Sequence, residues 1–182
     1  MIKVVRMAER PGKLWFYRSL FVFLAVSVSF TQLLPLNPGP GGLPGPDVML
    51  LIAFAWTVMR PDYVPVLLLA IVFLVLDFLL MRPPGLWTAL VVLCTEFLRA
   101  RHFQLRATSF LVEWLLVAAM IVVLTVVYQV LLAVFVVERP AIGLTLIRMI
   151  FTIVTYPLVV ILAGRALGLR KLRASEGIGQ RL

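Results

Sequence analysis

Long apolar segments occupy most of this chain and limit its fold more than any other feature. The segments are continuous rather than alternating, which is typical of membrane-spanning helices and unlike the strands of a membrane barrel. Hydrophobic residues make up 63% of the 182 residues and charged residues only 14%, whereas soluble domains hold about 45–50% and about 25%. The sequence therefore predicts an all-α, polytopic membrane protein with a single domain over residues 1–182, and excludes an ordinary soluble enzyme. Six transmembrane helices are expected, at residues 14–36, 47–59, 64–81, 86–98, 110–137 and 141–169.

Two of these segments, residues 47–59 and 86–98, are shorter than a membrane crossing requires. Each has about 13 residues and gives about 20 Å of helix, whereas the hydrocarbon core is about 30 Å thick. Such segments could lie at the interface or re-enter the same side. They could also cross inside the bundle by using flanking residues.

The distribution of basic residues favours six crossings. The N-terminal arm, the turn at Arg60, the turn at residues 99–106 and the C-terminal end would then share one side, and they hold most of the 17 Lys and Arg residues. The other side would hold only Arg82 and Arg139. Because membrane proteins keep Lys and Arg on the cytoplasmic side, both termini are expected in the cytoplasm. The net charge of +9 is then an orientation signal, so the bilayer is an expected partner and nucleic acid is not.

Residues suited to catalysis or metal binding are scarce. The chain has one cysteine, Cys94, and one histidine, His102, so it cannot form an intrachain disulfide or a Cys/His metal cluster. It contains no phosphate-binding loop and no serine beside the histidine. Asp47 and Asp77 could be imagined as an intramembrane aspartyl pair, but Asp77 lies in plain apolar sequence without the glycines that such a site would want. We therefore expect a protein that is not an enzyme and has no cofactor.

A few polar residues fall inside the expected spans, where each charge costs about 2.5 kcal/mol or more and so marks function or specific packing. Asp77 and Arg148 would lie about 6 Å and about 10 Å below the outer edge, and we expect these two side chains to pair. They would either fix the packing of the helices or line a pocket for a solute or for a polar group of a partner. The expected polar layer consists of Asp77, Arg148, Gln129, Ser27, Thr31 and Gln32.

A second polar group is expected near the cytoplasmic ends of the helices at residues 86–98 and 110–137. Acidic and basic residues lie close together in the sequence there, which indicates interfacial salt bridges. The members of this group are Glu96, Glu113, Arg99, Arg101 and Arg106.

Short motifs between about residues 44 and 100 resemble those of the rod shape-determining protein MreD family of bacteria. In that family a Pro-Asp pair opens the second helix, the third helix ends in a Leu-x-Asp motif, and a Leu-Gly turn leads into the fourth. The third helix of the family is often rich in glycine, whereas residues 63–77 contain none. The residues that carry the resemblance here are Pro46, Asp47, Asp77, Gly85 and Leu86.

The resemblance implies a role in building peptidoglycan during cell elongation, in the bacterial inner membrane. It implies a fold similar to the six-helix substrate-binding subunits of energy-coupling-factor transporters. The partners implied are MreC, the RodA/class B penicillin-binding-protein synthase directly or through MreC, and MreB filaments indirectly. We expect a non-enzymatic scaffold whose first three helices and outer loop face the partner. The alternative is a solute-binding subunit of a membrane transporter.

Overall fold

The computed structural model describes residues 11–33, 44–137 and 141–166, and these residues fold into helices joined by short turns. Those ranges contain no strand, so the all-helical fold class is confirmed. The elements are α1 (Pro11–Leu33), α2 (Val48–Met59), the short 3-10 helix η1 (Pro61–Tyr63), α3 (Val66–Leu79), α4 (Leu86–Ala100), α5 (His102–Ala107), α6 (Phe110–Val134) and α7 (Ile142–Ala166).

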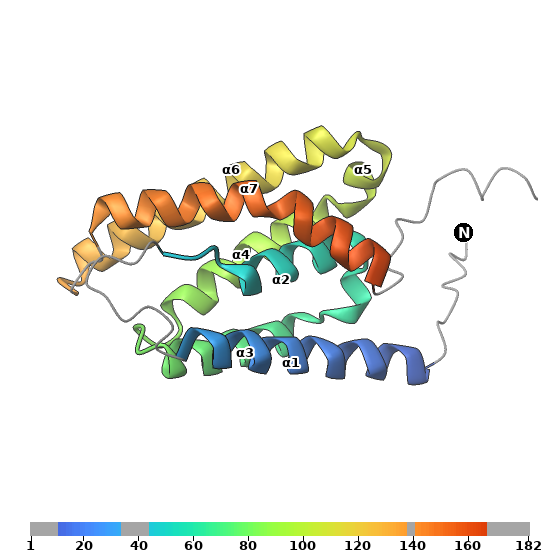
Figure 1. The fold of residues 1–182 in the computed structure, drawn as a ribbon, viewed down its shortest axis with the longest axis horizontal. Helices are drawn as coiled ribbons and strands as arrows, with labels where there is room; N and C mark the ends of the chain where they lie inside the picture. Colours follow the sequence, from blue (N-terminus) through green and yellow to red (C-terminus); the bar gives the residue numbers. More distant parts are fainter. Residues whose placement is uncertain (1–10, 34–43, 138–140, 167–182) are drawn as a thin grey trace, which may run out of the picture.

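The helices pack in three layers (Figure 1). Helices α1 and α3 form one outer layer, α2 and α4 lie in the middle, and α6 and α7 form the other outer layer. The longer helices run along one axis and alternate in direction. The α3–α4 end of the bundle holds the turn at residues 80–85 together with the starts of α2 and α7, and the α5 end holds α5 and the start of α1.

Helix α2 is the buried centre of the bundle. All of its residues from Met49 to Met59 are buried, as expected for a helix that is apolar on every side. Asp47 caps its first turn, and Arg60 ends it just before Pro61, which cannot continue a helix with normal hydrogen bonding. Helix α2 therefore lies inside the bundle, covered by the other helices.

Three helices are long and apolar enough to cross a membrane, namely Gly12–Leu33 in α1, Phe110–Val134 in α6 and Ile142–Arg165 in α7. Large apolar side chains cover their outward faces, for example Phe23 on α1, Val126 on α6 and Leu158 on α7. A soluble protein rarely exposes apolar patches of this extent. These three helices fit a membrane protein.

The helix boundaries expected from the sequence agree with the described ones to within a few residues. Helix α3 ends two residues early, at Leu79, because the chain turns there. Helix α6 likewise ends at Val134 rather than at residue 137. The short elements η1 and α5 were not expected. The expected ends at residues 36 and 169, residues 1–10 of the N-terminal arm and Arg139 lie outside the described residues, and residues 11–13 of the arm belong to α1.

The turn between α3 and α4 has a defined geometry. The Arg82 N–H donates to the Asp77 carbonyl over 2.9 Å, which closes the end of α3 around Met81 in the left-handed region at φ 54°. Gly85 then takes φ 84° as the N-cap of α4, a conformation that favours glycine. This turn places Arg82 and the start of α4 beside Asp77.

Replacing Gly85 with alanine is expected to lower the free energy of unfolding by about 1 kcal/mol, because alanine is strained at this positive φ. A Cβ would meet no atom within 4 Å, so strain rather than a clash sets the loss. The measurement is unfolding in mixed dodecyl maltoside and SDS micelles, followed by far-UV circular dichroism. The control is Gly143→Ala in α7, which also faces open space without a positive φ and should cost nothing. Equal losses of unfolding free energy in the two variants would contradict backbone strain at Gly85 as the cause.

Candidate functional site: a charged pocket at the α3–α4 end

A pocket of about 390 Å³ opens at the α3–α4 end of the bundle. The residues that line it belong to the start of α2, the turn at residues 80–85, the start of α4, and helices α6 and α7. Apolar side chains form much of the wall, among them Leu50, Trp87 and Ile121. The polar side chains that reach it include Asp47, Arg82, Tyr128, Gln129, Arg148 and Thr152.

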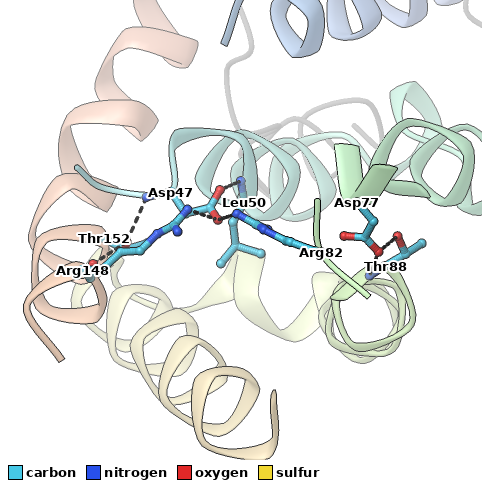
Figure 2. Close-up of polar contacts among 7 residues, drawn as sticks. All are labelled: Asp47, Leu50, Asp77, Arg82, Thr88, Arg148 and Thr152. Atoms are coloured by element: carbon cyan, nitrogen blue, oxygen red, sulfur yellow. Dashed lines mark hydrogen bonds and ion pairs between the residues drawn. The ribbon is translucent and has the colours of Figure 1, made fainter. Parts of the chain in front are cut away.

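Asp47 joins α2 to α7 at the edge of this pocket (Figure 2). Its Oδ1 accepts the N–H of Leu50 over 3.1 Å and so caps α2. Its Oδ2 accepts a hydrogen bond from Arg148 Nη2 over 3.0 Å. The backbone N–H of Asp47 donates to Thr152 Oγ1, also over 3.0 Å. Asp47 is buried, so this carboxylate is held by partners on two helices.

Arg82 brings a second guanidinium toward the same carboxylate. Its Nη2 lies 4.0 Å from Asp47 Oδ2, at the limit of an ion pair, and its guanidinium lies over the ring of Trp87, 5.2 Å from the centroid. Burial lowers the pKa of Arg82, which lies in the turn between two helices; Asp47 opposes this change and Arg148 adds to it. Asp77 also opposes the change, from the end of α3, so the two arginines lie near one acid that lines the pocket, Asp47, and one that does not, Asp77.

Helix α6 and the first turns of α7 also line the pocket. Gln129 Nε2 donates to Thr145 Oγ1 over 2.8 Å and ties α6 to α7. The ring of Tyr128 meets Trp87 edge to face, with centroids 4.9 Å apart. This contact joins α6 to the start of α4, which fixes the aromatic side of the pocket.

Asp77 caps α4 from the end of α3. Its Oδ2 accepts the N–H of Gly85 over 3.1 Å, the N–H of Thr88 over 3.2 Å and the hydroxyl of Thr88 over 2.8 Å. Gly85 has no side chain with which to cap the helix, so the carboxylate of Asp77 takes that role. The side chain of Asp77 is fully buried, with 0% exposure.

The expected pair between Asp77 and Arg148 is wrong. Arg148 binds Asp47 instead, and Asp77 turns toward Thr88 (Figure 2). The physical reason is that two unpaired helix N-termini lie at this end, and each takes one of the two carboxylates. From the sequence, Asp47 was expected to open the helix at residues 47–59, as in the family motif, and was not assigned to Arg148. Its position at the same end as Arg148 was the signal that could have identified the pair.

The prediction that α1 contributes side chains to the polar layer is also wrong. Ser27 Oγ donates to the Phe23 carbonyl and Thr31 Oγ1 to the Val28 carbonyl, so both hydroxyls bond to their own helix. Gln32 is exposed. Helix α1 packs against α3, η1 and α2, on the side of the bundle away from α6 and α7, and contributes no residue to the pocket.

At the α5 end, one expected salt bridge is present. Arg99 pairs with Glu96 over 3.0 Å and also donates to the Val64 carbonyl over 2.6 Å. Arg101 lies over the ring of Phe97. Glu113 is fully buried rather than interfacial and accepts a hydrogen bond from the Tyr156 hydroxyl over 3.0 Å. The side chain of Arg106 lies outside the described residues.

The motif residues gather at one end of the molecule. Pro46 and Asp47 start α2, Gly85 and Leu86 start α4, and Asp77 at the end of α3 accepts the Gly85 N–H. In the described ranges, no three His, Cys, Asp or Glu side chains lie close enough together to hold a metal ion. Comparison with protein-family models, with curated proteins and with solved structures finds no match.

Proposed function

We propose that this chain is a non-enzymatic membrane scaffold of the bacterial peptidoglycan elongation complex, as its resemblance to the MreD family implies. The observation that carries the proposal is the continuous network at the α3–α4 end. Arg148 binds Asp47, Asp47 faces Arg82, the Arg82 N–H bonds to the Asp77 carbonyl, and the Asp77 carboxylate caps α4. Residues that match the family motif across about 40 positions of sequence thus act together in one junction.

The proposed topology has six crossings with both termini in the cytoplasm, in a bacterial inner membrane. The alternating direction of the helices along one axis supports this topology (Figure 1). The arginines support it too, because Arg60, Arg99 and Arg101 lie toward the α5 end, the proposed cytoplasmic side. In this arrangement α2 and α4 cross inside the bundle, and the proposed fold is similar to that of the substrate-binding subunits of energy-coupling-factor transporters.

The proposed direct partner is MreC, through its single transmembrane helix. Through MreC the scaffold would act on RodA and the class B penicillin-binding protein, and indirectly with MreB. Large apolar side chains on α1 and α3 offer a surface for a partner helix, for example Phe23 and Leu67, which are 66% and 72% exposed. Apolar helix faces of this kind associate in membranes by close packing.

Photo-crosslinking in native membranes tests this partner. A benzoylphenylalanine at Phe23 or at Leu67 is expected to capture MreC, whereas the same probe at Val126 on α6 should not. Depletion of the protein is expected to turn rod-shaped cells into spheres. Capture of MreC from Val126 alone would move the partner face to α6. If none of the three probes captured MreC and depletion left the cell shape normal, the proposed role as a scaffold would be contradicted.

A second candidate function is a solute-binding subunit of a membrane transporter. The pocket of about 390 Å³ favours it, because solute sites are concave and combine apolar walls with a few polar groups. The two candidates predict different partners. Affinity purification from mild detergent is expected to recover MreC from a scaffold and an ATPase module from a transporter subunit.

A further inference from the structure

Among the described residues, the charged side chains that line the pocket at the α3–α4 end are two arginines, Arg82 and Arg148, and one acid, Asp47. Arg82 and Arg148 share the single carboxylate of Asp47, at 4.0 Å and 3.0 Å. One of the Asp47 oxygens is also engaged by the Leu50 N–H. Two guanidiniums that share one carboxylate retain capacity for a further anion, and the planar donor fork of arginine suits phosphate oxygens.

The remaining surface of the pocket suits the rest of an amphiphilic molecule. Leu50, Leu80, Ile121 and Leu144 form apolar walls, and the Tyr128 and Thr125 side chains bring hydroxyl groups to the same space. Ligand pockets commonly combine such walls with a few polar groups that orient the ligand. A free inorganic ion would leave the apolar walls without a partner.

The two arginines of the pocket lie toward the end of the bundle, at the level expected for lipid headgroups. Helices α6 and α7 have 25 residues each, or about 37 Å of helix, so their ends extend beyond a hydrocarbon core of about 30 Å. Arg148 lies in the second turn of α7, and Arg82 lies in the turn that follows α3. Both guanidiniums are therefore near a headgroup region rather than at the membrane centre.

We propose that this pocket binds the phosphate group of an anionic amphiphile, with Arg82 and Arg148 holding the phosphate and the apolar walls holding the first part of the chain. Such a site would serve the scaffold and the transporter subunit alike. Its test measures binding alone, so it can fail or succeed independently of the role in cell elongation.

Native mass spectrometry of the full chain from a neutral detergent tests the proposal. The probes are phosphatidic acid, phosphatidylglycerol, phosphatidylcholine and inorganic phosphate. We expect one tightly bound molecule of either anionic lipid, at least about tenfold weaker binding of phosphatidylcholine, and no retained inorganic phosphate. Arg82→Gln and Arg148→Gln should each weaken binding of the anionic lipids about tenfold or more, because each removes a charged hydrogen-bond donor.

Two further variants distinguish loss of binding from loss of folding. Arg82→Lys keeps the charge without the planar fork and should give binding between that of the wild type and Arg82→Gln. Arg101→Gln, at the opposite end over the ring of Phe97, should bind as the wild type does. Equal affinity for phosphatidylcholine and phosphatidylglycerol would overturn the proposal, as would unchanged binding in folded Arg82→Gln. Inorganic phosphate that binds as tightly as the lipids would overturn the proposal that the ligand is an amphiphile.

Discussion

Replacing Asp47 with alanine is expected to lower the free energy of unfolding by about 2–3 kcal/mol. The substitution removes the cap of α2, since Asp47 Oδ1 accepts the Leu50 N–H. It also leaves Arg82 and Arg148 side by side without their carboxylate. The lower part of the range for a broken ion pair applies, because the Arg148 side chain is 37% exposed and solvent screens part of its charge. Unfolding in mixed micelles, followed by far-UV circular dichroism, provides the measurement.

A double-mutant cycle isolates the ion pair from the cap. Asp47→Asn with Arg148→Gln is expected to show a coupling energy of about 1 kcal/mol, whereas Asp77→Asn with Arg148→Gln should show almost none. The control for the loss of a carboxylate is Asp62→Ala, at an exposed position in η1. If the coupling to Asp77 were the larger one, the pairing of Arg148 with Asp47 would be wrong.

The sequence predicted the main helices because their signal is local. An apolar run of helical length defines a segment wherever it packs, and the boundaries at Pro46, Pro61 and Gly85 come from residues with restricted or unusual backbone conformations. The burial of α2 could also be anticipated, since a helix that is apolar on all sides needs protein or lipid around it. Its place between two layers of helices was not part of that signal.

The sequence could not assign the ion pairs, because these depend on which helices are neighbours. Depth along the membrane placed Asp77 and Arg148 at a similar level, but depth carries no information about the distance across the bundle. In the structure, α2 lies against α7, and α3 lies against α4, so each acid meets the helix beside its own. The layer of α2 and α4 separates α3 from α7 (Figure 1). The same packing explains why Ser27 and Thr31 bond within α1.

Replacing Asp77 with leucine is expected to be at least as destabilising as the loss of Asp47, at about 3 kcal/mol. Leucine has similar size but accepts no hydrogen bond, so the Gly85 N–H, the Thr88 N–H and the Thr88 hydroxyl would all lose their acceptor. Thr88 is itself buried, so water cannot fully replace the carboxylate. The first turn of α4 would also lose the negative charge that complements its helix dipole. Unfolding in the same mixed micelles gives the loss.

Thr88→Val separates the contributions to this cap. Valine removes the hydroxyl donor but keeps the shape and the backbone N–H, so the expected loss is about 1 kcal/mol. In Asp77→Leu the same change should cost nothing further, because the hydroxyl no longer has the carboxylate to bind. Additive losses in the double variant would show that Thr88 and Asp77 act separately. A loss below about 1 kcal/mol in Asp77→Leu alone would show that α4 does not depend on the carboxylate of α3 for its cap.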